Sequence, residues 1–215
     1  MDAAITRELN VDFRPLPCRL WSYRYKTSLG AIYLERANQA FLTALQDMID
    51  SGCIDPITPH DRVFESGCNV GAVLRQIRDR YGCAVSGLDI SENAIKFMRE
   101  SVFSPDEGAE CFTGDVRNTA FFERFVDNTF SHTFCVAHLV HVPNGPDKTR
   151  TIEELKRISR NVVLFERIHS ASDASINRLH YTDYVRDHGF TEFRVLTKPH
   201  PHYEKRISIC YFTKP

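Results

Sequence analysis

Hydrophobic and polar positions follow two rhythms along the chain, one typical of helices and one typical of strands. Between residues 32 and 49, apolar residues recur every three or four positions, which predicts a helix that Ser51 and Gly52 end. From residue 61 onward, short apolar runs take turns with helical patterns. Strands are predicted at residues 62–65, 84–89, 110–113, 129–136, 161–168, 192–197 and 206–212, and helices at residues 71–81, 91–98, 121–125, 151–159 and 181–189.

The order of these elements predicts the fold class. Alternation of strands and helices is typical of a parallel sheet that is covered by helices. The last two strands are joined by residues 198–203, a connection too short for a crossover helix, so they are predicted to be antiparallel. We therefore expect an α/β fold with a doubly wound, mostly parallel seven-stranded sheet whose last strand is antiparallel. A helical and aromatic cap is expected over residues 1–55, and the core domain over residues 56–215.

Composition and charge narrow the class of protein. The 215 residues are 42% hydrophobic and 26% charged, as in ordinary folded proteins. Lys and Arg number 27 against 28 Asp and Glu, so the chain lacks the basic excess of a nucleic-acid binder. No apolar run approaches the roughly 18 residues of a membrane span, and the first residues lack a signal core. Seven scattered cysteines without a Cys-x-x-Cys pair favour reduced thiols, and we expect a cytoplasmic protein.

The segment Glu65-Ser-Gly-Cys-Asn-Val-Gly71 follows the first strand of the core and leads into a helix. Gly67 and Gly71 allow the backbone to turn sharply and to approach a ligand closely. Asn69 stands where a third glycine is often found, and asparagine tolerates a left-handed backbone better than most side chains. Free N–H groups at the start of the helix favour polar ligand groups. The segment is therefore predicted to be a ligand-binding turn.

Acidic residues follow the next two strands of the predicted sheet. Asp89 ends the second strand and is placed to accept hydrogen bonds from a ribose, while Asp115 follows the third strand and is suited to an adenine amino group. The carboxyl ends of adjacent parallel strands meet at one edge, where open α/β sheets bind ligands. A nicotinamide dinucleotide is the nearest rival ligand. The turn lacks the G-x-G-x-x-G spacing for a pyrophosphate, and Glu65 suits a cation better.

In these motifs the sequence resembles the class I S-adenosylmethionine-dependent methyltransferases of the small-molecule type. The matching segments are Glu65–Gly71, Gly87-Leu-Asp-Ile-Ser91, Thr113-Gly-Asp-Val116 and Leu139-Val-His-Val142. The resemblance implies a Rossmann-like fold, S-adenosyl-L-methionine as cofactor and S-adenosyl-L-homocysteine as product. It also implies a set of cofactor-binding residues: Glu65, Gly67, Cys68, Asn69, Gly71, Asp89, Ile90, Asp115, Val116 and Val136.

Within that resemblance, each group has an implied place. Glu65 and the glycine turn would line the methionine and ribose, Asp89 would bind the ribose hydroxyls, and Asp115 with Val116 would bind the adenine. The fourth strand departs from the family, because Ser131 and His132 stand where an acidic residue is usual.

Two histidines follow the fourth strand and are the candidate catalytic residues. Histidine is suited to accept a proton near neutral pH, and His141 matches the family segment better than His138. The alternative is a loop histidine that bonds the backbone. The two could also form a metal pair, but no further ligand occurs at a characteristic spacing, so no metal site is predicted.

Candidate substrate contacts lie mainly near the N-terminus. Aromatic faces can stack on a ring or contact a cation, and a guanidinium can hold an anionic group. The candidates are Trp21, Tyr25, Tyr33 and Arg36, together with Glu166 at the end of the fifth strand. The alternatives are aromatics that only cover the sheet edge and an ion pair of Glu166 with Arg167.

The leading hypothesis is methyl transfer to an oxygen or nitrogen of a small molecule, such as a sugar or a natural-product precursor. The expected partner is that small molecule, and nucleic acid is disfavoured by the net charge. Methylation of tRNA or protein is one alternative. A catalytically silent cofactor-binding domain that serves as a partner or regulator is another, motivated by Ser131 and His132 in place of an acidic residue.

Overall fold

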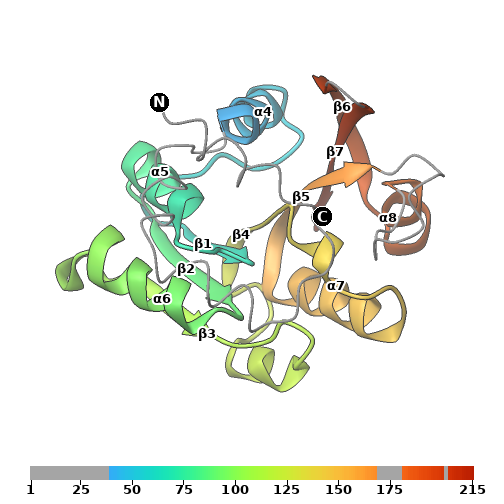
Figure 1. Ribbon diagram of the computed structural model, residues 1–215. Coiled ribbons are helices and arrows are strands. Elements are labelled where there is room, and N and C mark those ends of the chain that lie inside the picture. Colours follow the sequence, from blue (N-terminus) through green and yellow to red (C-terminus); the bar gives the residue numbers. More distant parts are fainter. Residues whose placement is uncertain (1–38, 169–180, 201–202) are drawn as a thin grey trace, which may run out of the picture.

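A seven-stranded mixed sheet forms the centre of the protein in a computed structural model, which describes residues 39–168, 181–200 and 203–215 (Figure 1). The strand order is β3-β2-β1-β4-β5-β7-β6. Strands β1 to β5 pair in parallel, and β7 runs antiparallel to both β5 and β6, which confirms the prediction. The strands are β1 (Arg62–Ser66), β2 (Ala84–Asp89), β3 (Glu110–Thr113), β4 (Phe130–Val136), β5 (Ser159–Ile168), β6 (Thr191–His200) and β7 (Tyr203–Thr213).

Helices lie between the strands as the alternating pattern predicts, with two differences. The predicted helix at residues 151–159 begins earlier, at Pro146, because proline is well suited to the first helical position. The stretch at residues 121–125 is a 3-10 turn over Thr119–Arg124. The helices are α4 (Gln39–Asp50), α5 (Ala72–Tyr81), α6 (Glu92–Phe97), α7 (Pro146–Ile158) and α8 (Tyr181–His188). Shorter turns are the π-helical Met98–Val102 and the 3-10 turns Pro105–Glu107 and Leu139–His141.

Each face of the sheet carries its own apolar core, because successive side chains of a strand point to opposite faces. One core combines Val63 and Phe134 of the strands with Phe41 of α4 and residues of α5. The Phe41 ring meets Phe134 at 5.3 Å and Phe165 at 5.7 Å between centroids. The part of the predicted cap that the structure describes is thus packed into the core, and the domain boundary at residue 55 stays a prediction.

The opposite face is covered by α7 and the 3-10 turn at Thr119–Arg124. Phe64 and Leu164 of the strands pack there with Leu155 of α7 and Phe122 of the turn. Since both faces are covered, a binding site can form in the loops at the ends of the parallel strands.

Ser131 and His132, the departure from the family pattern, lie in the amino half of β4. The Ser131 hydroxyl donates to the carbonyl of Arg62 at 3.0 Å, and His132 Nε2 lies 2.9 Å from the carbonyl of Asp55. Burial lowers the pKa of His132. These residues therefore brace the amino edge of the sheet, opposite to the edge where Glu65 and the glycine turn lie.

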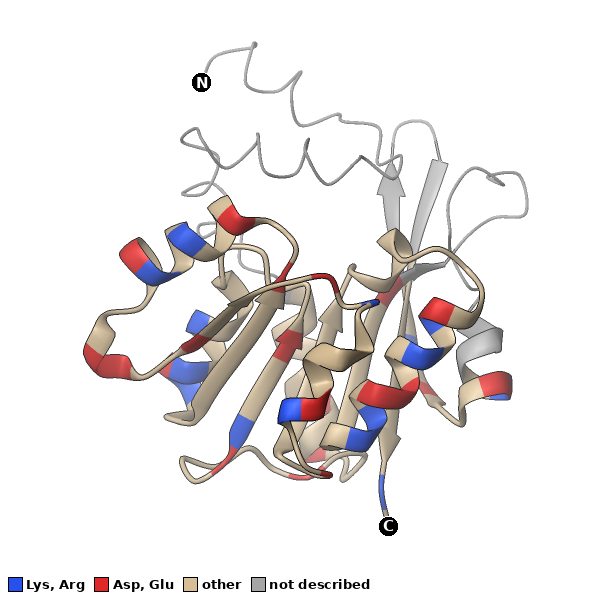
Figure 2. Ribbon diagram, turned by 90° about the horizontal axis from the view of Figure 1, so that it is seen from below, with Lys and Arg blue, Asp and Glu red and all other residues tan. Residues whose placement is uncertain are grey.

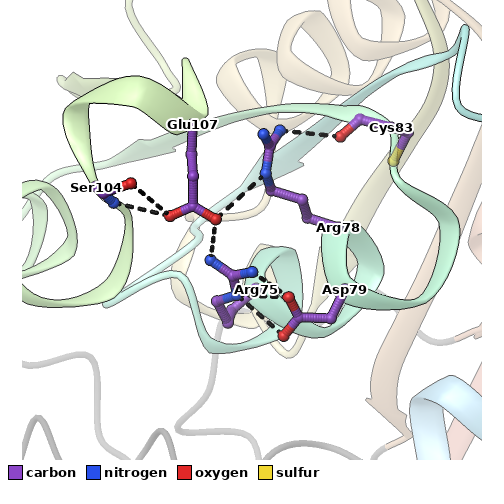
Figure 3. Close-up of polar contacts among 6 residues, drawn as sticks. All are labelled: Arg75, Arg78, Asp79, Cys83, Ser104 and Glu107. Carbon is purple, nitrogen blue, oxygen red and sulfur yellow. Dashed lines mark hydrogen bonds and ion pairs between the residues drawn. The ribbon is translucent and has the colours of Figure 1, made fainter.

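A polar network fastens α5 to the loop that precedes β3 (Figure 3). Glu107 accepts a hydrogen bond from the Ser104 N–H at 2.8 Å and forms an ion pair with Arg75. Arg78 Nε lies 3.6 Å from the same carboxylate, and Arg75 Nε also donates to Asp79 at 2.9 Å. The Ser104 amide and then Arg75 lower the pKa of Glu107 to about 2. The helix that begins at the glycine turn is thereby held in place.

Charges of both signs are mixed along the helices in the part of the chain that is described (Figure 2). On α7, for example, Lys156 lies 3.3 Å from Glu153, and Arg157 lies 2.8 Å from Glu154. Among the described helices, none has both the length and the apolar character that crossing a bilayer requires.

Candidate functional site

The turn between β1 and α5 has the left-handed backbone that its sequence predicts. The φ angles are 74° at Gly67, 55° at Asn69 and 78° at Gly71. A Cβ on Gly67 would lie 1.9 Å from Nδ1 of His138, and one on Gly71 would lie 2.9 Å from the Met98 side chain. Both positions therefore require glycine for space as well as for backbone conformation.

Asp89 holds this turn from the end of β2. Its Oδ2 accepts a hydrogen bond from the Asn69 N–H at 2.9 Å, and its Oδ1 accepts one from the Ser91 N–H at 2.8 Å. Burial raises the pKa of Asp89, while these amides oppose the rise. Asp89 thus shapes the turn, which sequence reasoning did not foresee, and its contact with a ribose stays a prediction.

Glu65 lies beside Asp89 on the same face of the sheet. The register pairs Glu65 with Gly87, and Asp89 is the next residue of β2 that points to that face. The Glu65 side chain is buried, and its Oε2 has no hydrogen-bond partner. Burial, and then the nearby Asp89 carboxylate, raise the pKa of Glu65 well above its ordinary value.

Buried polar atoms without a hydrogen-bond partner gather at this carboxyl edge. Each such atom costs about 1–3 kcal/mol when it stays unpaired, so most buried polar groups in proteins have partners. They come from the end of β1, the glycine turn, the segment after β4 and the end of β5. The atoms are Glu65 Oε2, Asn69 Oδ1, His138 Nε2 and Glu166 Oε2. Their concentration indicates a place that is prepared for a polar ligand.

His138 lies at the centre of this edge, with its ring over Gly67. Burial and the neighbouring His141 lower the pKa of His138 to about 3, which keeps the imidazole neutral at neutral pH. A neutral imidazole with so low a pKa is a weak proton acceptor but a good hydrogen-bonding group. His141 is half-buried in the turn Leu139–His141, and its N–H donates to the carbonyl of His138 at 2.9 Å.

Glu166, at the end of β5, holds the histidine segment. Its Oε1 accepts hydrogen bonds from the N–H groups of His138 at 3.0 Å and Leu139 at 2.8 Å. Burial raises the pKa of Glu166 to about 7, against these amides and the nearby Lys148. The structure thus brings Glu166 to the same edge as the glycine turn, where the sequence predicts it.

Lys148 is the group at this edge that the sequence did not reveal. It is fully buried in the first turn of α7, and its Nζ donates to Asn144 Oδ1 at 2.8 Å. The predicted helix began at residue 151, which left Lys148 in a loop. Gly145-Pro146 is the signal that could have placed the helix start correctly.

Asp115 lies at this edge, and its carboxylate accepts a hydrogen bond from an arginine side chain. Arg117 Nε donates to Asp115 Oδ1 at 2.9 Å, and this guanidinium lowers the pKa of the carboxyl. The remaining candidates line the same region. Cys68 and Val116 are buried, Val136 is half-buried at the end of β4, and Ile90 is 36% exposed.

The predicted substrate contacts of the N-terminal segment, Trp21, Tyr25, Tyr33 and Arg36, lie outside the described residues. Within the three ranges that the structure describes, no group of three or more His, Cys, Asp or Glu side chains is arranged to hold a metal ion.

Comparison with known proteins gives one family and many similar folds. Residues 63–161 match the family described as "Methyltransferase domain". Over 99 residues the chain is 25% identical to "Methyltransferase GfsG" of Streptomyces halstedii, a match that covers 46% of this chain and 34% of that protein. The match thus spans about a third of the length of this curated relative.

Solved structures with the same fold include one methyltransferase in complex with a partner and one with a bound cofactor. A Haloferax volcanii methyltransferase in complex with the Trm112 activator has a TM-score of 0.64 at 16% identity and covers 88% of this chain and 96% of that one. Magnesium protoporphyrin IX methyltransferase from Synechocystis, with bound SAM, has a TM-score of 0.55 at 16% identity and covers 94% and 99%. At these identities, the likeness shows the fold.

Proposed function

We propose that the chain, whose residues 63–161 match the methyltransferase-domain family, is a class I S-adenosylmethionine-dependent methyltransferase that transfers a methyl group from S-adenosyl-L-methionine to an oxygen or nitrogen of a small molecule. The proposal rests on one observation above all. The left-handed glycine turn, two buried carboxyl groups and several unpartnered polar atoms meet at the carboxyl edge of adjacent parallel strands.

The residues at this edge fit the chemistry of the donor. S-adenosylmethionine carries an adenosine and two cationic groups but no phosphate, and bound there it supplies a methyl group activated by a positive sulfur. Glu65 would pair with the methionine ammonium, Asp89 would accept from the ribose hydroxyls, and Asp115 would accept from the adenine amino group. The rest of the proposed donor site is the turn with Gly67, Cys68, Asn69 and Gly71, and the apolar side chains of Ile90, Val116 and Val136.

The other residues at the edge would serve the acceptor. Methyl transfer requires alignment of donor and acceptor, and an acceptor hydroxyl or amine must also lose a proton. We assign the proton-accepting role to His141, and we assign to His138 a neutral hydrogen-bonding role that its low pKa supports. Glu166 would contact the acceptor through its unpartnered Oε2. Trp21, Tyr25, Tyr33 and Arg36 would complete the acceptor side.

Two observations support a small-molecule acceptor: the distribution of charge, and the substrate named for an enzyme with a similar fold. In the view of Figure 2, Lys and Arg lie among Asp and Glu along the described helices, a distribution that supports a small acceptor over a nucleic acid. The Synechocystis enzyme with a similar fold is named for magnesium protoporphyrin IX, which is a small molecule. A second candidate is a methyltransferase that needs a protein activator, which the Haloferax complex with Trm112 motivates.

Calorimetry tests the donor assignment. We expect the protein to bind S-adenosylmethionine and S-adenosylhomocysteine and not to bind NAD. Binding of NAD alone would refute the proposal. Transfer of a radiolabelled methyl group to members of a small-molecule panel then tests the acceptor class, and transfer only after addition of a Trm112 protein would select the second candidate.

A further inference from the structure

Glu65, which is buried, and Asp89, which is half-buried, form a pair of carboxyl groups whose charge is not balanced by a side chain. Both lie on one face of the sheet, at the ends of the adjacent strands β1 and β2. Asp89 accepts hydrogen bonds from two backbone amides, which stabilise its ionised form, whereas Glu65 Oε2 has no partner. Among the described residues, no Lys or Arg forms an ion pair with either group.

The other titratable groups that interact with Glu65 do not change this balance. One is the thiol of Cys68, in the glycine turn. The other is the thiol of Cys135, at the end of β4, which points to the opposite face of the sheet because the register pairs Glu65 with Phe134. Both thiols are buried, and burial raises the pKa of each well above its ordinary value, so both are neutral at neutral pH. Glu65 therefore has one carboxylate and two neutral thiols as titratable neighbours, and ionising it would place two like charges side by side.

We propose that Glu65 carries a proton in the donor-free protein and releases it when the donor binds, so that the donor ammonium pairs with the newly ionised carboxylate. This inference rests on the proposed function and concerns the same site. The proton leaves the Glu65 carboxyl for the buffer, and no covalent bond to the ligand forms or breaks. An ammonium is present in both S-adenosylmethionine and S-adenosylhomocysteine, so both ligands should displace the proton.

Linkage fixes how affinity depends on pH. When binding releases one proton, Kd falls up to about tenfold for each pH unit of increase, until the pH exceeds the pKa of the group in the free protein. We therefore expect donor affinity to strengthen as pH rises from 5 to 7. A preformed carboxylate would give an affinity that stays constant over the same range.

Titration calorimetry on the full chain measures both quantities. Binding of S-adenosylhomocysteine in two buffers that differ in ionisation enthalpy gives the number of protons released, and Kd is measured from pH 5 to pH 7. We expect release approaching one proton and a fall in Kd of about tenfold or more over that range. A constant Kd with no proton release would overturn the inference while leaving donor binding intact, and absence of any binding would instead refute the proposed function.

Two variants and a second ligand sharpen the test. Glu65→Gln mimics the neutral carboxyl, and we expect it to bind with a higher Kd, no proton release and no pH dependence. The matched control is Glu123→Gln, an exposed glutamate of the turn Thr119–Arg124, which should release protons as the wild type does. Equal release with S-adenosylmethionine supports the ammonium as the partner. Persistence of release in Glu65→Gln would contradict the assignment to Glu65.

Discussion

Replacing Glu166 by glutamine should change how the stability of the protein depends on pH. Burial raises the pKa of Glu166 from an ordinary 4.5 to about 7, so the folded state holds its proton more tightly than the unfolded state does. The stability linked to this proton is fully present below pH 4.5 and is lost as pH rises through about 7. At ~1.4 kcal/mol per pKa unit, the difference between the two pKa values corresponds to about 3 kcal/mol in the free energy of unfolding.

Glutamine removes this pH dependence because its amide stays neutral. Its oxygen can still accept from the N–H groups of His138 and Leu139, as Glu166 Oε1 does. Its NH2 group takes the place of the unpartnered Oε2 and costs about 1–3 kcal/mol at every pH, since buried donors without partners are unfavourable. The variant should therefore be less stable than the wild type at pH 5 and should recover by about 3 kcal/mol relative to it at pH 8.

Urea unfolding followed by circular dichroism at pH 5 and pH 8 measures this difference for the variant and the wild type. Glu123→Gln, on an exposed residue, is the matched control and should change stability equally at both pH values. Should Glu166→Gln also shift stability by the same amount at pH 5 and pH 8, the burial of an ionisable carboxyl at the end of β5 would be the wrong explanation.

Three further substitutions test the turn, its support and the core. Gly67→Ala should lower the free energy of unfolding by about 1–2 kcal/mol because of its left-handed backbone, and by more because the new Cβ collides with His138. Gly108→Ala, with a φ of 65° and nothing within 4 Å, should lower it only by the backbone part, and equal losses of the two variants in urea unfolding would contradict the contact with His138. Asp89→Asn should lower the free energy of unfolding by about 1–3 kcal/mol and raise the Kd for S-adenosylhomocysteine at least tenfold by calorimetry. Asp106→Asn, at an exposed position of the turn Pro105–Glu107, should change neither quantity. Phe41→Ala should cost about 3–5 kcal/mol in thermal or urea unfolding, and a near-neutral result would mean that α4 is a separable cap.

The sequence predicts the sheet well because its signals are local and repeated. Short apolar runs such as Val162–Phe165, separated by helical patterns, fix the parallel strands, and the short link before β7 fixes its direction. The meeting of Glu65, Asp89 and Asp115 at one edge follows from the same logic, since the carboxyl ends of adjacent parallel strands share an edge.

What the sequence could not predict depends on packing and on partners. The weak basicity of His138 comes from burial over Gly67, and periodicity carries no information about that contact. Asp115 is paired with Arg117, a neighbour whose direction is set only by the loop. Lys148 reads as a solvated charge, yet the early start of α7 buries it. In each case a tertiary contact decides the chemistry of a residue whose type the sequence shows.

Because β7 lies between β5 and β6, the described sheet connects β6 to the parallel strands through β7. Among the described strands, β6 forms a backbone ladder with β7 alone, while β7 pairs on both sides, with β6 and, over eight residue pairs, with β5. Any fluctuation that peels β7 from β5 must carry β6 away with it, whereas β6 can fray without disturbing the parallel strands. Amide protons of β6 should for that reason exchange with solvent no more slowly than those of β7, and those of β4 should exchange most slowly of the three.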